Sequence, residues 1–385
     1  MIDHATLKAA LAGRALPAAY VDLAAFDANV ATTLLRAGDL PIRIATKSLR
    51  CVPLIQRVLA ASPRFQGLMC YHPREALTLH AHGFDDLLVA YPVVQEAEIR
   101  AVAQAVAAGA RITLMVDSPA HVERLTGSGI PLCLDVDMSA RLPGLHFGVR
   151  RSPVTTVEQA LAVLAAARAA GLVLEGVMGY EAQIAGVPDE APGDPTNPVI
   201  RWLKSRSRRE LAERRGAVVK ALRDAGAELR FVNGGGTGSL ESTAADPSVT
   251  EVTAGSAFYA PTLFDHYRAF KGRPAAGFAL AVTRIPGPGL YTCYGGGYIA
   301  SGAPGPAKLP SPYLPVGAQL LSHEGAGEVQ TPIAYEGKLA LGDPVGFRHA
   351  KAGELCERFD RLLLLLDGGV FDDVLTYRGE GFNFG

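Results

Sequence analysis

Eight short β-rich runs, separated by Ala- and Leu-rich stretches of helical period, occupy the chain between residues 40 and 256. The runs span residues 42–46, 65–70, 86–90, 111–116, 131–136, 172–179, 229–232 and 250–254. This alternation favours parallel strands joined by crossover helices. Eight strand-helix units are typical of a closed α/β barrel of the TIM type. We therefore predict such a barrel over residues 20–265.

The chain changes character after residue 270, where Gly and Pro are frequent between short β-like runs. We predict a second, mostly β domain made of residues 1–19 and 266–385. Residues 185–198 are a polar segment, and residues 201–215 are a charged stretch in which arginines alternate with Glu210 and Glu213. We interpret the two segments as an insertion that consists of a loop and a solvated helix.

The composition favours a cytoplasmic enzyme with a small-molecule substrate. The 385 residues are 49% hydrophobic and 19% charged, and the formal net charge of -1 provides no global attraction to nucleic acid or to an anionic membrane. No apolar stretch is long enough to span a bilayer. Five cysteines without a CxxC pair indicate a reducing compartment, and the N-terminus lacks the apolar core of a secretion signal.

Polar and small residues follow the predicted strands at their ends, where an α/β barrel carries its catalytic groups. They are Lys47, Tyr71, His72, Asp117, Asp137, Arg141, Tyr180, Glu181, Asn233, Gly235, Gly236, Thr237, Gly255 and Ser256. Lys47 follows the first run. A lysine that is buried at this place loses hydration, which favours the neutral amine that attacks an aldehyde. The alternative is a lysine that is structural or simply solvated.

Two neighbouring segments have the composition of anion-binding loops. NGGGTGS (233–239) follows the seventh run, and Gly255 with Ser256 follows the eighth. Glycines allow backbone N–H groups to converge on an anion, and Thr237 adds a hydroxyl donor. Barrels often hold a phosphate at these two loops, although a flexible turn is the alternative. The two loops predict a phosphate-bearing ligand near Lys47.

Arg141 and Tyr180 are further candidates for ligand contacts. Arg141 is placed to face a cofactor ring or a substrate carboxylate, and its alternative is a surface salt bridge. Tyr180 is placed to stack on a ligand, bond to it or exchange protons with it, and its alternative is packing at the barrel rim. The C-terminal tail, with Tyr377, Arg378 and Glu380, can fold back toward the site.

Seven segments together carry a family resemblance that covers most of the chain. They are LPAAYVDLAAFDANV, IRIATKSLRC, LDVDMSARLPG, GVMGYEAQ, NGGGTGS, TEVTAGSAFY and GDPVGFRHAKAGELCERFD. The chain resembles the D-threonine aldolase and D-serine dehydratase family of pyridoxal phosphate (PLP) enzymes, within the alanine-racemase-like group of fold type III. The resemblance implies a homodimer, a Schiff base between Lys47 and PLP, and Arg141 or Tyr180 near the ring. It also implies a phosphate held by Gly235, Gly236, Thr237, Gly255 and Ser256.

The chain departs from this family at one point. The aldolases and dehydratases typically carry a His-x-Cys or His-x-Asp pair in the C-terminal domain, which binds a divalent metal that polarises the β-hydroxyl of the substrate. This chain has His349-Ala350-Lys351, and a protonated lysine cannot ligate a metal. His349 is therefore the only candidate ligand. We hypothesise that Lys351 supplies the missing positive charge and that no metal is used; the alternative is that both residues are simply exposed.

The resemblance implies a lyase that acts on a D-β-hydroxy amino acid. We predict Lys47, Tyr180, His349 and Lys351 as its catalytic residues. Removal of the Cα proton by Lys47 and loss of hydroxide would make a dehydratase. Removal of the β-hydroxyl proton by a base near His349 would instead make an aldolase, which releases glycine and an aldehyde. Three alternatives stay open: an amino-acid racemase of the same fold, a non-catalytic PLP carrier, and a barrel that binds a phosphorylated sugar.

Overall fold

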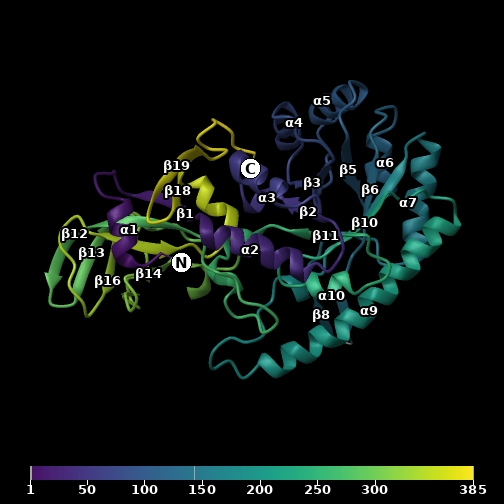
Figure 1. Cartoon of the computed structure of the whole chain (residues 1–385). Coiled ribbons are helices and arrows are strands. Elements are labelled where there is room, and N and C mark those ends of the chain that lie inside the picture. The colour runs from purple at the N-terminus through teal and green to yellow at the C-terminus, as the bar shows by residue number, and fades with distance from the viewer. Residues whose placement is uncertain (1, 143, 385) are drawn as a thin grey trace.

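The computed structural model describes residues 2–142 and 144–384, which form two packed units (Figure 1). The larger unit is a closed barrel with the strand order β10-β11-β2-β3-β4-β5-β6-β9, and all its pairings are parallel. The eight strands are β2 (Ile42–Ala45), β3 (Phe65–Cys70), β4 (Leu87–Val89), β5 (Ile112–Val116), β6 (Leu132–Asp135), β9 (Leu174–Gly179), β10 (Phe231–Gly234) and β11 (Glu251–Ala254). The predicted barrel is confirmed, and only β10 extends past its predicted run, by two residues.

Helices alternate with the barrel strands, beginning with one that precedes β2, and several of them begin at local sequence signals. They are α2 (Leu23–Arg36), α3 (Val52–Ala61), α4 (Pro73–Ala81), α5 (Glu96–Ala107), α6 (Pro119–Arg124), α7 (Val157–Ala169), α8 (Ala182–Ala185), α9 (Asn197–Asp224), α10 (Leu240–Ala244) and α11 (Ser256–Tyr259). Ser118 caps α6 ahead of a proline, and Thr156 and Gln159 form a capping box at α7.

The smaller unit is built on a nine-stranded sheet, which confirms the predicted mostly β domain. Its strands are β1 (Ala18–Asp22), β12 (Ala276–Gly287), β13 (Leu290–Tyr294), β14 (Ser311–Leu314), β15 (Gln319–Leu320), β16 (Gln330–Ala334), β17 (Pro344–Arg348), β18 (Arg361–Leu366) and β19 (Gly369–Leu375). Helix α1 (His4–Ala10) packs against β17 and β19. Strand β1 pairs with β12 and β18, so residues 20–22 of the range that we assigned to the barrel belong to this sheet.

Aromatic packing joins the two units. Phe26 of α2 lies 6.2 Å from Phe258 and 6.0 Å from Tyr259 of α11, measured between ring centroids. In the sheet, Phe278 and Phe347 stack at 5.3 Å. All five rings belong to one continuous cluster of buried apolar residues. The barrel and the sheet therefore share a core, which holds the sheet over the barrel mouth.

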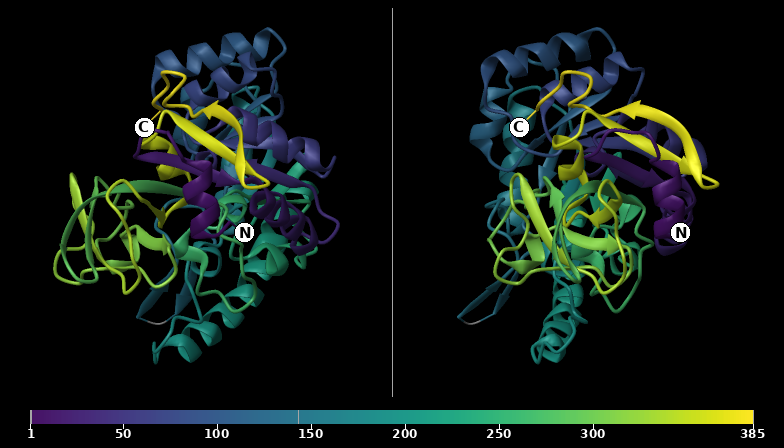
Figure 2. Two further views of the ribbon diagram at one scale, coloured as in Figure 1. Left: turned by 60° about the vertical axis from the view of Figure 1, so that its left-hand side comes forward. Right: turned by 90° about the vertical axis from the view of Figure 1, so that its left-hand side faces the viewer.

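Two excursions leave the barrel. A hairpin of β7 (Ala140–Leu142) and β8 (Leu145–Phe147) lies between β6 and β9 in the sequence. Residues 186–196 form a loop that leads into α9, a 28-residue helix that extends away from the barrel in Figure 2. The predicted loop and helix are both present. Among the described helices, none combines the length and the apolar character that a membrane crossing requires.

Candidate active site

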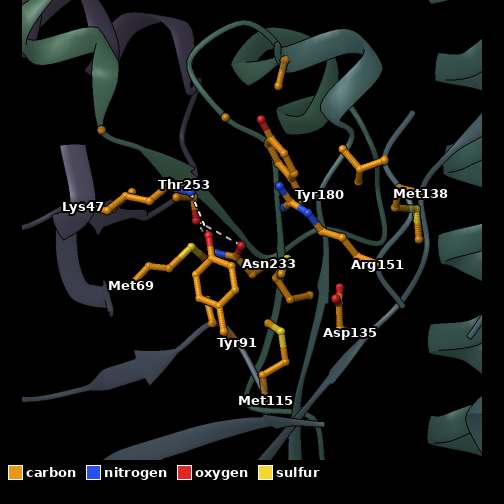
Figure 3. Close-up of a pocket in the computed structure, with 18 of the residues that line it drawn as sticks. Lys47, Met69, Tyr91, Met115, Asp135, Met138, Arg151, Tyr180, Asn233 and Thr253 are labelled. Carbon is orange, nitrogen blue, oxygen red and sulfur yellow. Dashed lines mark hydrogen bonds between the residues drawn. The ribbon is translucent and has the colours of Figure 1, made fainter. Parts of the chain in front are cut away.

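A cavity of about 400 Å³ opens at the carboxyl ends of the barrel strands (Figure 3). We call it the inner cavity. Residues that follow the strands form its wall, and methionines and Asp135 lie deeper among the strands. The lining includes Lys47, Ser48, Met69, Tyr91, Met115, Asp117, Asp135, Met138, Arg151, Met178, Tyr180, Asn233, Gly235, Gly236, Thr237, Gly255 and Ser256. The structure thus brings ten of the fourteen predicted strand-end residues into one cavity, Asp137 among them.

Lys47 lies in the 3-10 turn Thr46–Ser48 that follows β2, and its side chain reaches the cavity. Its Nζ donates a hydrogen bond to Oη of Tyr91 at 2.9 Å. The side chain is exposed rather than buried, so our expectation of a buried lysine is wrong for this structure. The reason is that the barrel mouth is open above the turn. No carboxylate is paired with Lys47 among the described residues.

The glycine loop after β10 is held from behind by a buried ion-pair network. Gly235 adopts φ +83°, a conformation that favours glycine, and its N–H donates to Oε2 of Glu181 at 2.8 Å. Glu181 is paired with the buried Arg215, which is also paired with Asp246. The N–H of Thr237 has no acceptor among the described residues. The ion-pair network therefore holds the glycine loop in place, and the N–H of Thr237 is available to donate to an anion.

The second small-residue loop is packed directly on the turn that carries Lys47. A Cβ on Gly255 would lie 2.8 Å from the carbonyl oxygen of Ala45 and 2.8 Å from Cβ of Ser48. Ser256 and Ser48 are 3.2 Å apart at their hydroxyl oxygens, and the N–H of Ala257 donates to Oγ1 of Thr237 at 3.0 Å. The two predicted loops are therefore in contact with each other and with the lysine turn.

Arg151 and Tyr180 form the opposite wall. The Arg151 guanidinium lies 5.6 Å from the centroid of the Tyr180 ring. Burial raises the pKa of Tyr180, and Arg151 opposes this effect. Arg151 was not among our predicted residues, although it closes a hairpin that leaves the barrel mouth. The backbone of the predicted Arg141 lies in β7 of that hairpin, but its side chain is outside the described part of the structure.

Acidic side chains lie beneath this wall. Burial and the neighbouring Asp117 raise the pKa of Asp135 to about 7, while Arg151 lowers it. Asp117 is itself paired with His121 at 2.9 Å. We predicted Asp117 from its place after a strand, but missed Asp135, which is the last residue of β6. The cavity therefore contains a carboxyl group that changes its charge near neutral pH.

A second, larger cavity of about 1080 Å³ lies between the barrel mouth and the β domain. We call it the outer cavity. Lys47, Tyr91, Arg151, Tyr180 and Ser256 line both cavities, so the two spaces meet at the lysine. The outer cavity adds His349 and Lys351, the two residues predicted from the C-terminal domain. It also adds Arg378, Asn383 and Phe384, so the C-terminal tail does fold back to this site.

His349 is a buried, neutral imidazole. Burial lowers its pKa to about 3, with Arg348 as the next contribution, and neither ring nitrogen has a hydrogen-bond partner among the described residues. Lys351 is half-exposed and is engaged by two neighbours, because its Nζ donates to Ser301 at 2.6 Å and lies 3.0 Å from Glu354. The described residues contain no group of three His, Cys, Asp or Glu side chains arranged around a metal.

Positive charge dominates the lining of the outer cavity. Seven cationic side chains face only two carboxylates among the described lining residues, namely Lys47, Arg50, Arg151, Lys308, Lys351, Arg358 and Arg378 against Glu354 and Glu357. Glu357 is paired with Arg50 and Glu354 with Lys351. The cavity is therefore suited to an anionic small molecule.

Comparison with known proteins agrees with this geometry. Residues 21–262 match the family model described as the alanine racemase N-terminal domain. A D-threonine aldolase from an Arthrobacter species is 27% identical over 243 residues, which cover 62% of this chain and 60% of the relative. The chain thus spans about three fifths of the length of that curated relative.

Two solved structures share the fold over nearly the whole chain. A D-threonine aldolase from Filomicrobium marinum superposes with a TM-score of 0.78 at 22% identity and covers 96% of both chains. A D-threo-3-hydroxyaspartate dehydratase from a Delftia species gives a TM-score of 0.74 at 20% identity, with 95% of this chain and 98% of the other covered. Both likenesses include the barrel and the β domain.

Proposed function

Because the chain belongs to the family of the alanine racemase N-terminal domain, we propose that it is a PLP-dependent lyase acting on a D-β-hydroxy amino acid. One observation carries the proposal: Lys47 reaches into a cavity walled by two small-residue loops, at the end of the barrel where such enzymes do their chemistry. The relatives named D-threonine aldolase and D-threo-3-hydroxyaspartate dehydratase support this substrate class.

The residues of the inner cavity fit PLP. Lys47 would supply the amine for covalent attachment, and the loops of Gly235, Gly236, Thr237, Gly255 and Ser256 would supply backbone and hydroxyl donors for the phosphate. Gly236 leaves space beside Tyr180, because a Cβ there would lie 3.0 Å from Cε2 of that ring. When bound, PLP supplies a sink for the electron pair that is released when a bond at Cα breaks.

The side chains of this protein decide which bond breaks. Nζ of Lys47 would remove or return a proton at Cα of the substrate. Arg151 and the other cations of the outer cavity attract the substrate carboxylate and orient it. A base near His349 would accept the proton of the β-hydroxyl, which leads to aldol cleavage. Loss of hydroxide after removal of the Cα proton leads to dehydration.

We further propose that the protein works without a divalent metal. Among the described lining residues the outer cavity offers one imidazole, and Lys351 occupies the position at which the family resemblance implies a second metal ligand. Lys351 places a positive charge beside His349, although Glu354 shares that charge. Stoichiometric zinc, manganese or magnesium in the purified protein, together with loss of activity on chelation, would overturn this proposal.

We also propose that the protein is a cytoplasmic homodimer. All five cysteines are free and buried, which supports a reducing compartment.

The decisive experiment combines a spectrum with product analysis. Purified protein is expected to show visible absorbance that borohydride fixes on Lys47, and D-threonine or D-serine is expected to yield glycine plus aldehyde, or oxoacid plus ammonia. Chiral analysis of recovered alanine separates a racemase from a lyase. Absence of turnover with the absorbance present would indicate a carrier. A Lys47→Ala variant that still holds a borohydride-reducible group would refute the assignment of the lysine.

A further inference from the structure

Tyr91 touches the reactive atom of Lys47, yet no step described above uses it. It follows β4 by two residues and precedes Pro92 at the barrel mouth. Its Oη accepts the 2.9 Å hydrogen bond from Nζ of Lys47, and the same Nζ lies 5.6 Å from the ring centroid. The lysine therefore meets the hydroxyl of Tyr91 rather than the face of its ring (Figure 3).

We propose that Tyr91 is the acid-base partner of Lys47, whose hydroxyl oxygen exchanges a proton with Nζ of the lysine. In one direction an N–H bond of the ammonium breaks and an O–H bond forms on the phenolate of Tyr91. The reverse transfer restores the ammonium, so protons and charge balance within the pair. The proposal rests on the proposed function, because a lysine that acts on Cα needs a group that takes up and returns its proton.

The charged surroundings of Tyr91 favour this exchange. Lys47 approaches from the turn after β2, Arg151 from the hairpin after β6, Asp135 from the end of β6, and Tyr180 from the end of β9. Burial raises the pKa of Tyr91, but Lys47 and Arg151 outweigh burial and Asp135, so that the pKa lies below its ordinary value. Two cations thus stabilise the phenolate that the exchange requires.

Tyr180 provides an internal comparison. It lines the same two cavities and lies near the same Arg151, but among the described residues the hydrogen bond and the ring contact of Lys47 go to Tyr91 and not to Tyr180. Its pKa is raised by burial, whereas that of Tyr91 is lowered. The difference between the two phenols follows from the contact with Lys47 and from exposure, because Tyr91 keeps 36% of its surface accessible. That exposure gives its proton a path to substrate or solvent.

The coupling can be measured in the apoenzyme, where it does not depend on turnover. Ultraviolet difference titration counts phenolates as the pH rises, and Tyr91→Phe is expected to remove the first tyrosine to ionise. Lys47→Met is expected to move that ionisation to higher pH by at least one pH unit, a tenfold change in the proton affinity of Tyr91. Tyr294→Phe, which removes a half-exposed phenol outside both cavities, serves as the matched control and is expected to keep the early ionisation.

The holoenzyme supplies the second measurement. Tyr91→Phe is expected to lower kcat by about 10²-fold with a small change in KM, and to shift the pH profile of kcat. Identical titrations of the wild-type protein and Tyr91→Phe, or an unchanged pH profile, would overturn the proposal. Coupled titrations in a protein that cleaves no D-β-hydroxy amino acid would refute the proposed function while supporting the pair.

Discussion

The contact between Gly353 and the lysine turn provides a sharp test of how the β domain supports the site. Gly353 lies in the 3-10 segment Ala352–Glu357, and a Cβ at this position would lie 1.7 Å from the carbonyl oxygen of Lys47 and 3.1 Å from Cα of Ser48. Real Cβ atoms do not approach closer than 3.0 Å. A Gly353→Ala variant must therefore separate two backbone segments by roughly 1 Å or more.

The cost follows from this displacement. Overpacking lowers the free energy of unfolding by about 1–3 kcal/mol. We expect Gly353→Ala to lie at the upper end of this range, because backbone rather than a flexible side chain must move. A shift of about 1 Å at Lys47 is expected to lower kcat/KM by about 10²-fold. Urea unfolding of the apoenzyme measures the free energy of unfolding, and steady-state kinetics with D-threonine or D-serine measures kcat/KM.

Gly216→Ala is the matched control, because Gly216 lies inside α9 with nothing within 4 Å of its added Cβ. This variant is expected to leave activity unchanged and to raise the free energy of unfolding by up to about 1 kcal/mol. If Gly353→Ala had the stability and activity of the wild-type protein, the β domain would not support the lysine turn in the way inferred here.

Three further predictions test the electrostatics of the site. Glu181→Gln leaves Arg215 with Asp246 alone, and we expect urea unfolding of the apoenzyme to show a loss of about 3 kcal/mol, together with weaker PLP binding in a fluorescence titration. Burial raises the pKa of Asp135 to about 7, so this residue destabilises the fold increasingly as the pH rises from about 4 to 7. Asp135→Asn is expected to remove this pH-dependent destabilisation, so the apoenzyme of the variant should be more stable than the wild-type apoenzyme by roughly 2–4 kcal/mol at pH 8 but not at pH 4. Equal differences at both pH values would contradict the raised pKa of Asp135. The seven cations of the outer cavity predict a KM that rises with salt, and a KM that is constant between about 0.01 and 0.15 M ionic strength would refute steering by this charge.

Local patterns were sufficient to predict the barrel. Each of its strands is a short run rich in apolar residues, most of them with β-branched members, and a strand of this kind is recognisable without knowledge of its neighbours. The place of catalytic groups followed from the same pattern, because the carboxyl ends of parallel strands meet at one mouth. Lys47, Tyr180 and the two glycine loops were predicted in this way. The same rule applied to 86–90 points to Tyr91, which we overlooked because a tyrosine at a strand end is common.

Other features depend on contacts between residues that are far apart in the sequence. Strand β1 pairs with strands more than 250 residues away, so its place in the β domain is not written in residues 18–22 themselves. Arg151 does not directly follow a barrel strand, and it reaches the wall only because the chain turns back toward Tyr180 after the β7–β8 hairpin. The exposure of Lys47 depends on how far the β domain stands from the barrel mouth.

The sequence alone determined the eight-strand barrel, the mostly β second domain, and the lysine and loops at the strand ends, because each rests on short-range periodicity or on residue chemistry. Only the tertiary structure decided that Lys47 donates a hydrogen bond to Tyr91, that the buried His349 has no hydrogen-bond partner among the described residues, and that Lys351 is paired with Glu354. These properties depend on burial and on distances of about 3 Å between distant segments, which packing sets and periodicity does not encode.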